Sequence, residues 1–281
     1  MNKFRWNNCP LCSSAELYFV DGIVYRKPVF FSTNEIEICH PPELWKCRQC
    51  LSCFVQNTVD ADTAKMLYST GQAGERWAAE AFDQNKTLNV INNMTKVFKN
   101  KGKVLDVGCN TGELLDFARS FGCKTSGIEF STGSRELLAN KGHSAYSTFE
   151  ECLDEYDVIT AFDLVEHLYD MPTFLKRCRE KLAENGRLVI LTGNVDSLSA
   201  RLSGARWWYA QYPEHIAFPS KKYFMEYSGF QIEKWIPTYA SKGYKYPIFQ
   251  IVRGALSGFL KMRYSGLPSF GSDHTLIVLR K

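Results

Sequence analysis

The sequence lacks the features that mark membrane and secreted proteins. No apolar run reaches the roughly 18 residues that a membrane-spanning helix requires, and the first residues, MNKFRW, contain no signal-peptide core. Lys and Arg number 34 against 30 Asp and Glu, and the resulting charge of +4 is too small to indicate a nucleic-acid or membrane partner. We therefore expect a cytoplasmic protein that does not insert into a membrane.

Cysteine is plentiful, although the expected compartment does not favour disulfides. The chain has 281 residues, enough for one α/β domain and an appendage, and it contains ten cysteines. A reducing cytoplasm excludes a disulfide framework, so the spacing of these cysteines needs another explanation. Cys9 and Cys12 form one C-x-x-C pair, Cys47 and Cys50 form a second, and 34 residues lie between the pairs.

The two C-x-x-C pairs indicate a metal site. Thiolates two residues apart on a tight turn can both reach one tetrahedral ion, and a second pair closes its coordination shell. We interpret residues 1–60 as a zinc ribbon whose closed site is structural, with short strands at 18–20, 23–25 and 35–38. Cys39, His40 and Cys53 are alternative ligands, and a set of free buried thiols is the alternative to a metal site.

A helical segment is expected after the ribbon. Apolar spacing predicts helices over 61–68, 75–82 and 87–98, with a break at 69–74. We interpret residues 61–98 as a linker that covers a cofactor. Tyr68 and Arg76 can reach a ligand from it, but a solvated helical face is the simpler interpretation of these two residues.

The most informative stretch is Lys103 to Gly112, KVLDVGCNTG. A β-favouring run over 104–107 ends at two glycines, and a helical pattern begins at Glu113. A strand that turns into a helix through glycines lets a ligand approach bare backbone at the helix N-terminus. The spacing is G-x-x-x-G and differs from the G-x-G-x-x-G of dinucleotide binders.

Lys103 to Gly112 resembles motif I of class I S-adenosylmethionine-dependent methyltransferases, in which this turn holds the amino-acid end of the cofactor. An acidic residue at the end of the second strand is also placed to accept the ribose hydroxyls, and Glu129 has that position. An ordinary βα turn and a surface carboxylate are the respective alternatives. The cofactor-binding residues that the resemblance implies are Asp106, Gly108, Cys109, Asn110, Gly112, Glu129, Phe130 and Phe162.

The remaining pattern alternates strands and helices, as a doubly wound α/β fold requires. The resemblance implies a Rossmann-like, seven-stranded sheet over residues 99–281, with the last strand antiparallel. Residues 240–273 form an insertion without an assigned role. The expected strands are 104–107, 124–129, 143–146, 156–162, 186–191, 231–239 and 274–280.

Catalytic candidates follow the fourth and fifth expected strands. Asp163, Glu166 and His167 would share one face of a helical turn. They resemble the E-x-x-E-H metal-binding set of ubiquinone-type O-methyltransferases, with Asp in place of the first Glu. The chain after the fifth strand, WWYAQYPEHIAF, resembles a stretch of methyltransferases found with sugar and polysaccharide genes, and His215 in it is a candidate base.

These features predict an S-adenosylmethionine-dependent O-methyltransferase for a sugar-derived, nucleotide-sugar, glycan or natural-product acceptor. The base would be His215 or His167, with packing and helix capping as the alternative roles of Asp163 and Glu166. Either no metal is needed, which we favour, or the Asp163 set holds a divalent ion such as Mg²⁺. An RNA methyltransferase and a non-catalytic zinc-ribbon module are alternatives, but residues 1–60 show no basic cluster.

Overall fold

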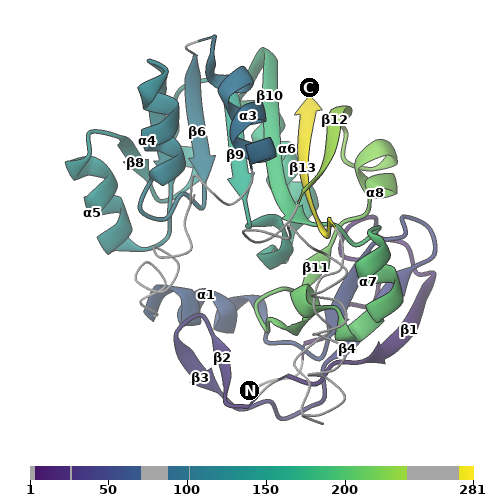
Figure 1. Ribbon diagram of the computed structural model, residues 1–281. Coiled ribbons are helices and arrows are strands. Elements are labelled where there is room, and N and C mark those ends of the chain that lie inside the picture. The colour runs from purple at the N-terminus through teal and green to yellow at the C-terminus, as the bar shows by residue number, and fades with distance from the viewer. Residues whose placement is uncertain (1–3, 26, 71–87, 101, 239–271) are drawn as a thin grey trace.

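The computed structural model describes residues 4–25, 27–70, 88–100, 102–238 and 272–281 (Figure 1). A large sheet with its helices forms the upper half in Figure 1, and a smaller sheet forms the lower half. Within the described ranges, no helix combines the length and apolar character needed to cross a bilayer.

The large sheet has seven strands in the order β12-β13-β10-β9-β6-β7-β8. Neighbours from β8 to β10 run parallel, and β13 is antiparallel to both β10 and β12. Numbered within the sheet, the order is 3-2-1-4-5-7-6, which confirms the expected Rossmann-like methyltransferase fold. The strands are β6 (Lys103–Val107), β7 (Lys124–Ile128), β8 (Ser144–Tyr146), β9 (Tyr156–Phe162), β10 (Leu182–Gly193), β12 (Gln231–Thr238) and β13 (His274–Arg280).

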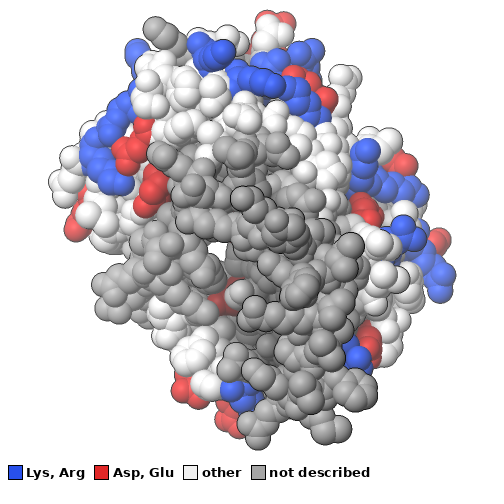
Figure 2. Space-filling view, in the orientation of Figure 1, with Lys and Arg blue, Asp and Glu red and all other residues white. Residues whose placement is uncertain are grey.

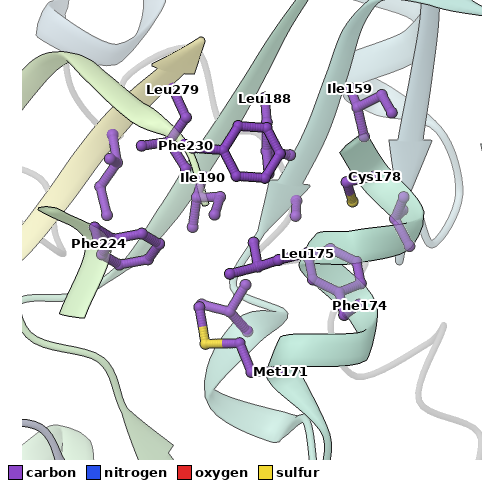
Figure 3. Packing of buried hydrophobic residues seen from close by; sticks show 14 of the residues in the cluster. Ile159, Met171, Phe174, Leu175, Cys178, Leu188, Ile190, Phe224, Phe230 and Leu279 are labelled. Carbon is purple, nitrogen blue, oxygen red and sulfur yellow. The ribbon is translucent and has the colours of Figure 1, made fainter. Parts of the chain in front are cut away.

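Both faces of the sheet are covered, because its strands carry apolar residues on both sides. Alternate residues of β13 enter two cores: Ile277 and Leu279 enter one, and Leu276 and Val278 enter the other. The first core also receives side chains from α6 (Met171–Lys181) and α8 (Lys221–Glu226), as Figure 3 shows. The second core is completed by α3 (Leu88–Phe98), α4 (Glu113–Ser120) and α5 (Thr132–Asn140).

Short polar caps fix where two of these helices begin. Ser131 accepts a hydrogen bond from the Ser134 N–H at the start of α5. Asp170 accepts one from the Thr173 N–H at the start of α6, which also has a proline in its first turn. Each cap satisfies a backbone donor that the helix cannot satisfy itself.

The small sheet is assembled from two distant parts of the chain. Its order is β1-β4-β5-β11, in which β1 (Leu17–Gly22), β4 (Glu43–Cys47) and β5 (Cys53–Gln56) come from the N-terminal segment. The fourth strand, β11 (Ala217–Phe218), comes from the segment after β10. Figure 1 shows purple β1 and β4 beside green β11 and α7 (Leu198–Ser203). The zinc-ribbon segment therefore shares its sheet with the rest of the chain.

Some expected boundaries differ from the structure. The strand expected at 23–25 is wrong, because β1 ends at Gly22; a separate hairpin joins β2 (Val29–Phe31) and β3 (Asn34–Ile36). The first linker helix, α1 (Ala61–Thr70), continues two residues past the expected end at 68. The expected helix at 75–82 and residues 240–271 of the expected insertion lie outside the described residues.

Candidate active site

The glycine turn between β6 and α4 has the backbone geometry that a close-approaching ligand needs. Gly108, Asn110 and Gly112 have φ values of 73°, 47° and 85°, in the left-handed region. A Cβ on Gly112 would lie 2.5 Å from the Leu138 Cδ2 atom, so only glycine fits between the turn and α5. No side chain caps the first turn of α4. Its backbone N–H groups form the expected anion-compatible end of the helix.

Glu129 lies against this turn, as the sequence predicts for a ribose-binding carboxylate. Its Oε2 atom accepts a hydrogen bond from the Asn110 N–H at 3.0 Å, and its Oε1 atom accepts one from the Ser131 N–H at 3.1 Å. Next to it, the Phe130 ring is 62% exposed, which leaves a face for a stacked base. Phe162 is half-buried at the end of β9. These predicted cofactor residues thus gather at the carboxyl edge of neighbouring strands.

Asp106 and Cys109 have buried side chains that support the turn from within. The Thr160 hydroxyl of β9 donates a hydrogen bond to Asp106 Oδ1 at 2.6 Å. Burial raises the pKa of the Asp106 carboxyl to about 7. The Cys109 thiol contacts the Ile128 carbonyl at 3.7 Å, and burial raises its pKa well above the usual value.

A second group of side chains follows β9 and β10. One side-chain ligand atom each from Glu166, His167 and His215 lies within 4.8 Å of the other two. The loop after β9, which carries Glu166 and His167, touches the glycine turn, because a Cβ on Gly108 would lie 3.1 Å from the Leu164 Cδ1 atom. The structure therefore brings the two histidine-bearing loops of the sequence together, beside the predicted cofactor site.

Glu166 is completely buried and is held by two hydroxyl groups. Thr192 at the end of β10 donates to its Oε2 atom at 2.8 Å, and the Tyr209 hydroxyl donates to its Oε1 atom. Burial, together with the negative charge of Asp163, raises the pKa of the Glu166 carboxyl to about 7. Glu166 is thereby fixed within the core that supports both histidines.

Both histidines are neutral near pH 7, and their tautomers follow from their neighbours. His215 Nδ1 lies 2.7 Å from the Tyr209 carbonyl oxygen, and a carbonyl only accepts, so Nδ1 carries the proton. The lone pair of His215 is then on Nε2. Burial lowers the pKa of His215 well below its usual value, with a further contribution from the nearby His167.

His167 has a similar environment. Its Nδ1 lies 3.1 Å from the Glu214 carbonyl, to which it donates, and 2.9 Å from the Tyr68 hydroxyl of α1. Burial lowers the pKa of His167 as well. The imidazole rings of His167 and His215 lie 4.8 Å apart, centroid to centroid. Tyr68, which the sequence favoured as part of a solvated face, therefore contacts this group.

Asp163 is separate from the histidine pair. Its φ is 47°, and the 3₁₀ helix of this loop begins only at Val165, so the expected helical face shared with Glu166 and His167 is wrong. The half-exposed Asp163 carboxylate lies 3.8 Å from His274 Nε2, at the start of β13. Asp163 is therefore not one of the three converging residues, although its charge still contributes to the raised pKa of Glu166.

Sequence reasoning missed the side chains that support the site from other elements. Tyr209 contacts Glu166 and the ring of His215, whose centroid lies 4.2 Å away. Trp208 stacks on His274 at 5.6 Å. Trp208 and Tyr209 belong to the aromatic stretch that precedes His215 in the sequence, but no local pattern predicts their partners on β13 and after β9.

The four cysteines of the C-x-x-C pairs converge as their spacing predicts. Cys9 Sγ lies 3.7 Å from Cys50 Sγ, and Cys12 Sγ lies 3.6 Å from Cys47 Sγ. All four sulfur atoms lie within 4.8 Å of one another. In the described part of the chain, the alternative ligands Cys39, His40 and Cys53 are not in this group. Four convergent thiol groups are the donor set of a structural zinc site.

The strand order and the glycine turn define the fold of a class I S-adenosylmethionine-dependent methyltransferase. The chain belongs to the methyltransferase domain family, whose model matches residues 79–233.

Curated relatives match part of the chain. One is the ubiquinone biosynthesis O-methyltransferase of Bradyrhizobium diazoefficiens, 30% identical over 142 residues, which cover 46% of this chain and 53% of that protein. The enzyme of the same description from Rhodopseudomonas palustris is 28% identical over 142 residues, with the same coverage. The chain thus spans about half the length of these relatives.

A solved structure, an S-adenosylmethionine-dependent methyltransferase from Archaeoglobus fulgidus, is similar with a TM-score of 0.49 and 19% identity. The match covers 79% of this chain and 100% of that one.

Proposed function

We propose that this protein is an S-adenosylmethionine-dependent methyltransferase that methylates an oxygen atom of a small hydroxylated acceptor. The observation that carries the proposal is the pair of neutral imidazoles of half-buried His167 and buried His215, which lie 4.8 Å apart on loops after β9 and β10. A neutral imidazole can accept a hydroxyl proton near pH 7. Its position next to a cofactor cradle is the arrangement that proton removal during methyl transfer requires.

The cofactor half of the site rests on the turn and on Glu129. Asn110 and Gly112 hold the backbone in the conformation that lets an amino-acid group approach. Glu129 already lies at hydrogen-bonding distance of that turn, so its carboxylate is preorganised to accept ribose hydroxyls. The exposed Phe130 ring provides an adjacent apolar surface for adenine.

Proton removal is the chemical work that falls to the chain's own residues. When bound, S-adenosylmethionine supplies a methyl group that its sulfonium has already activated. His215 Nε2 would take the proton of the acceptor hydroxyl as that oxygen accepts the methyl group. The Tyr209 carbonyl keeps the His215 proton on Nδ1, so Nε2 remains the basic atom. His167 is the alternative base.

The class of acceptor is inferred from the walls of the site. The Tyr212 ring lies 5.0 Å from the His215 ring, and Trp208 contacts Tyr212 edge to face at 6.0 Å. Such aromatic rings can stack on the C–H faces of a sugar or on a ring. The relatives named above are O-methyltransferases of ubiquinone biosynthesis, which supports oxygen as the methylated atom. We retain a sugar-derived, glycan or natural-product acceptor as the proposed class.

A magnesium ion is not needed for this mechanism. The separated Asp163 leaves two imidazoles and one buried carboxylate, and magnesium prefers oxygen ligands. Zinc fits the other cluster: Cys9, Cys12, Cys47 and Cys50 would hold it, and it would supply folding energy without taking part in catalysis. The cytoplasm, which keeps thiols reduced, is the proposed location.

RNA is a less suitable acceptor. Residues 1–60 contain no basic cluster, and in Figure 2 Asp and Glu lie beside many of the Lys and Arg residues of the described surface.

The test combines binding and turnover. Isothermal titration with S-adenosylhomocysteine should give one site per chain, and isotope-labelled methyl transfer to a panel of sugars, nucleotide sugars and phenols should identify an acceptor. Wild-type protein that does not bind the cofactor product would refute the proposal, and methylation of RNA alone would replace the acceptor class.

A further inference from the structure

The chain immediately after His215 is held by the zinc-ribbon segment. Strand β11 pairs with β5, with Ala217 opposite Phe54 and Phe218 opposite Cys53. Phe54, Ala217 and Phe218 are at most 1% exposed, so this seam lies in the interior. Because a strand pairing has discrete registers, it fixes the position of the residues next to it.

Ile216 connects three segments through its peptide groups. Its N–H donates to the Glu166 carbonyl at 2.8 Å, and its carbonyl accepts from the Val55 N–H at 2.8 Å. The loop that bears His215 is thus tied to the loop that bears His167 on one side and to the ribbon on the other. A displacement of β5 would move the backbone directly adjacent to His215.

The second tie starts at the turn that carries Cys47 and Cys50, which we call the knuckle. The Ser220 N–H donates to Ser52 Oγ at 3.0 Å, and the Ser220 hydroxyl donates to the Cys50 carbonyl. The same hydroxyl accepts from the Tyr223 N–H at 3.0 Å and so caps α8. Ser52 belongs to the knuckle, because its carbonyl accepts from the Cys47 N–H at 2.9 Å. Both serines are buried, at 0% and 1% exposure, so water does not replace these bonds.

Among the residues that the structure describes, the cofactor half of the site has no comparable tie to residues 1–60. Glu129 and the glycine turn contact each other and α5, and their hydrogen bonds join β6, β7 and the start of α5. In the sheet, β6 and β7 are separated from the β10 segment by β9. A displacement of the backbone at the knuckle should therefore move His215 more than it moves Glu129.

We propose that Ser220 and Ser52 are positioning residues for His215: they transmit the geometry of the four-cysteine centre through β11 to the acceptor half of the active site. This inference rests on the proposed function. It predicts that metal loading controls the orientation of the His215 imidazole while cofactor binding remains independent of it.

The test uses the full chain with Ser220→Ala, the conservative Ser220→Thr, and a matched control. Ser228→Ala is that control, because Ser228 is also buried, and its hydroxyl donates to the Phe224 carbonyl at the other end of α8. Ser52→Ala serves as a second variant, which removes the acceptor for the Ser220 N–H together with the hydroxyl that hydrogen-bonds Cys50. Zinc content by elemental analysis should stay the same in all four.

The main readout is the imidazole nitrogen NMR spectrum of histidine-labelled protein. The chain has five histidines, and the signal that is missing in His215→Gln is the one from His215. Ser220→Ala, Ser52→Ala and zinc-stripped wild type should lose the pure Nδ1–H pattern of His215, whereas Ser228→Ala and Ser220→Thr should keep it. Turnover in Ser220→Ala should fall about 10- to 100-fold, as misplacement of a reacting group by about 1 Å can cause. Affinity for S-adenosylhomocysteine should not change.

An unchanged His215 spectrum in Ser220→Ala, Ser52→Ala and zinc-stripped protein would overturn the inference and leave the proposed function intact. Loss of cofactor binding together with the His215 signal would also overturn it, because the centre would then support the whole fold. If wild type binds no S-adenosylhomocysteine, the proposed function fails, and the spectra still decide whether the serines position His215.

Discussion

Replacing Glu129 with alanine is expected to weaken S-adenosylmethionine binding by about 1–3 kcal/mol. The carboxylate accepts hydrogen bonds from the Asn110 and Ser131 N–H groups, so it is already oriented and little ordering is needed on binding. A hydrogen bond to a charged acceptor contributes about 1.5–3 kcal/mol. Water can replace part of it in the variant, because Asn110 and Ser131 are only half-buried. The dissociation constant should rise about 5- to 150-fold.

Glu129→Gln sharpens this expectation. The amide keeps one acceptor oxygen, but its NH₂ group must face either the Asn110 or the Ser131 N–H, so two donors meet. We expect an affinity between those of wild type and alanine. Glu136→Ala is the matched control, because this carboxylate is exposed on α5. Titration calorimetry with S-adenosylhomocysteine measures the affinity of all three variants. If Glu129→Ala binds as tightly as wild type and its melting temperature is unchanged, Glu129 is not part of the cofactor site.

Three further predictions concern catalysis and metals. His215→Ala should lower turnover about 10²–10⁴-fold without changing cofactor affinity. Because burial lowers the pKa of His215 well below its usual value of about 6.5, the wild-type rate should already be level at pH 6.5 and should fall only at lower pH. A rate that still climbs above pH 8 would contradict this base. EDTA should leave methyltransferase activity unchanged while zinc remains bound. If EDTA abolishes the activity, magnesium or manganese restores it, and Glu166→Ala lowers turnover as much as His215→Ala does, then a divalent ion assists catalysis. Elemental analysis should find one zinc per chain. A preparation that was never exposed to chelators and still contains no zinc would rule out zinc binding by the four cysteines.

The shared sheet also changes what zinc removal should do. The sequence alone predicts that removing the metal unfolds residues 1–60 while the rest of the chain stays folded. The core that contains Cys9, Cys47 and Cys50 also contains Tyr223 and Phe224 of α8, so residues 1–60 share buried surface with α8. Chelation should therefore disturb the 212–220 loop as well, which hydrogen exchange can measure.

The sequence by itself determined the parts of this protein that depend on local pattern. The turn at Gly108 and Gly112 needs left-handed backbone, and the β-favouring run before it needs burial, so the strand, the turn and α4 follow from adjacent residues. Strands β9 and β13 begin and end where the pattern predicts. The C-x-x-C spacing similarly brings together the four cysteines, because each pair is confined to a tight turn.

Only the tertiary structure decided which distant side chains meet. Tyr68 and His167 are 99 positions apart, and their contact depends on how α1 packs over the carboxyl edge of the sheet. The left-handed Asp163 separated that residue from Glu166 and His167, although their spacing suggested one helical face. The joining of β11 to the ribbon sheet was equally hidden, since a two-residue strand has no periodicity to detect. Its pairing is selected by burial against β5, a partner more than 160 residues away in the chain.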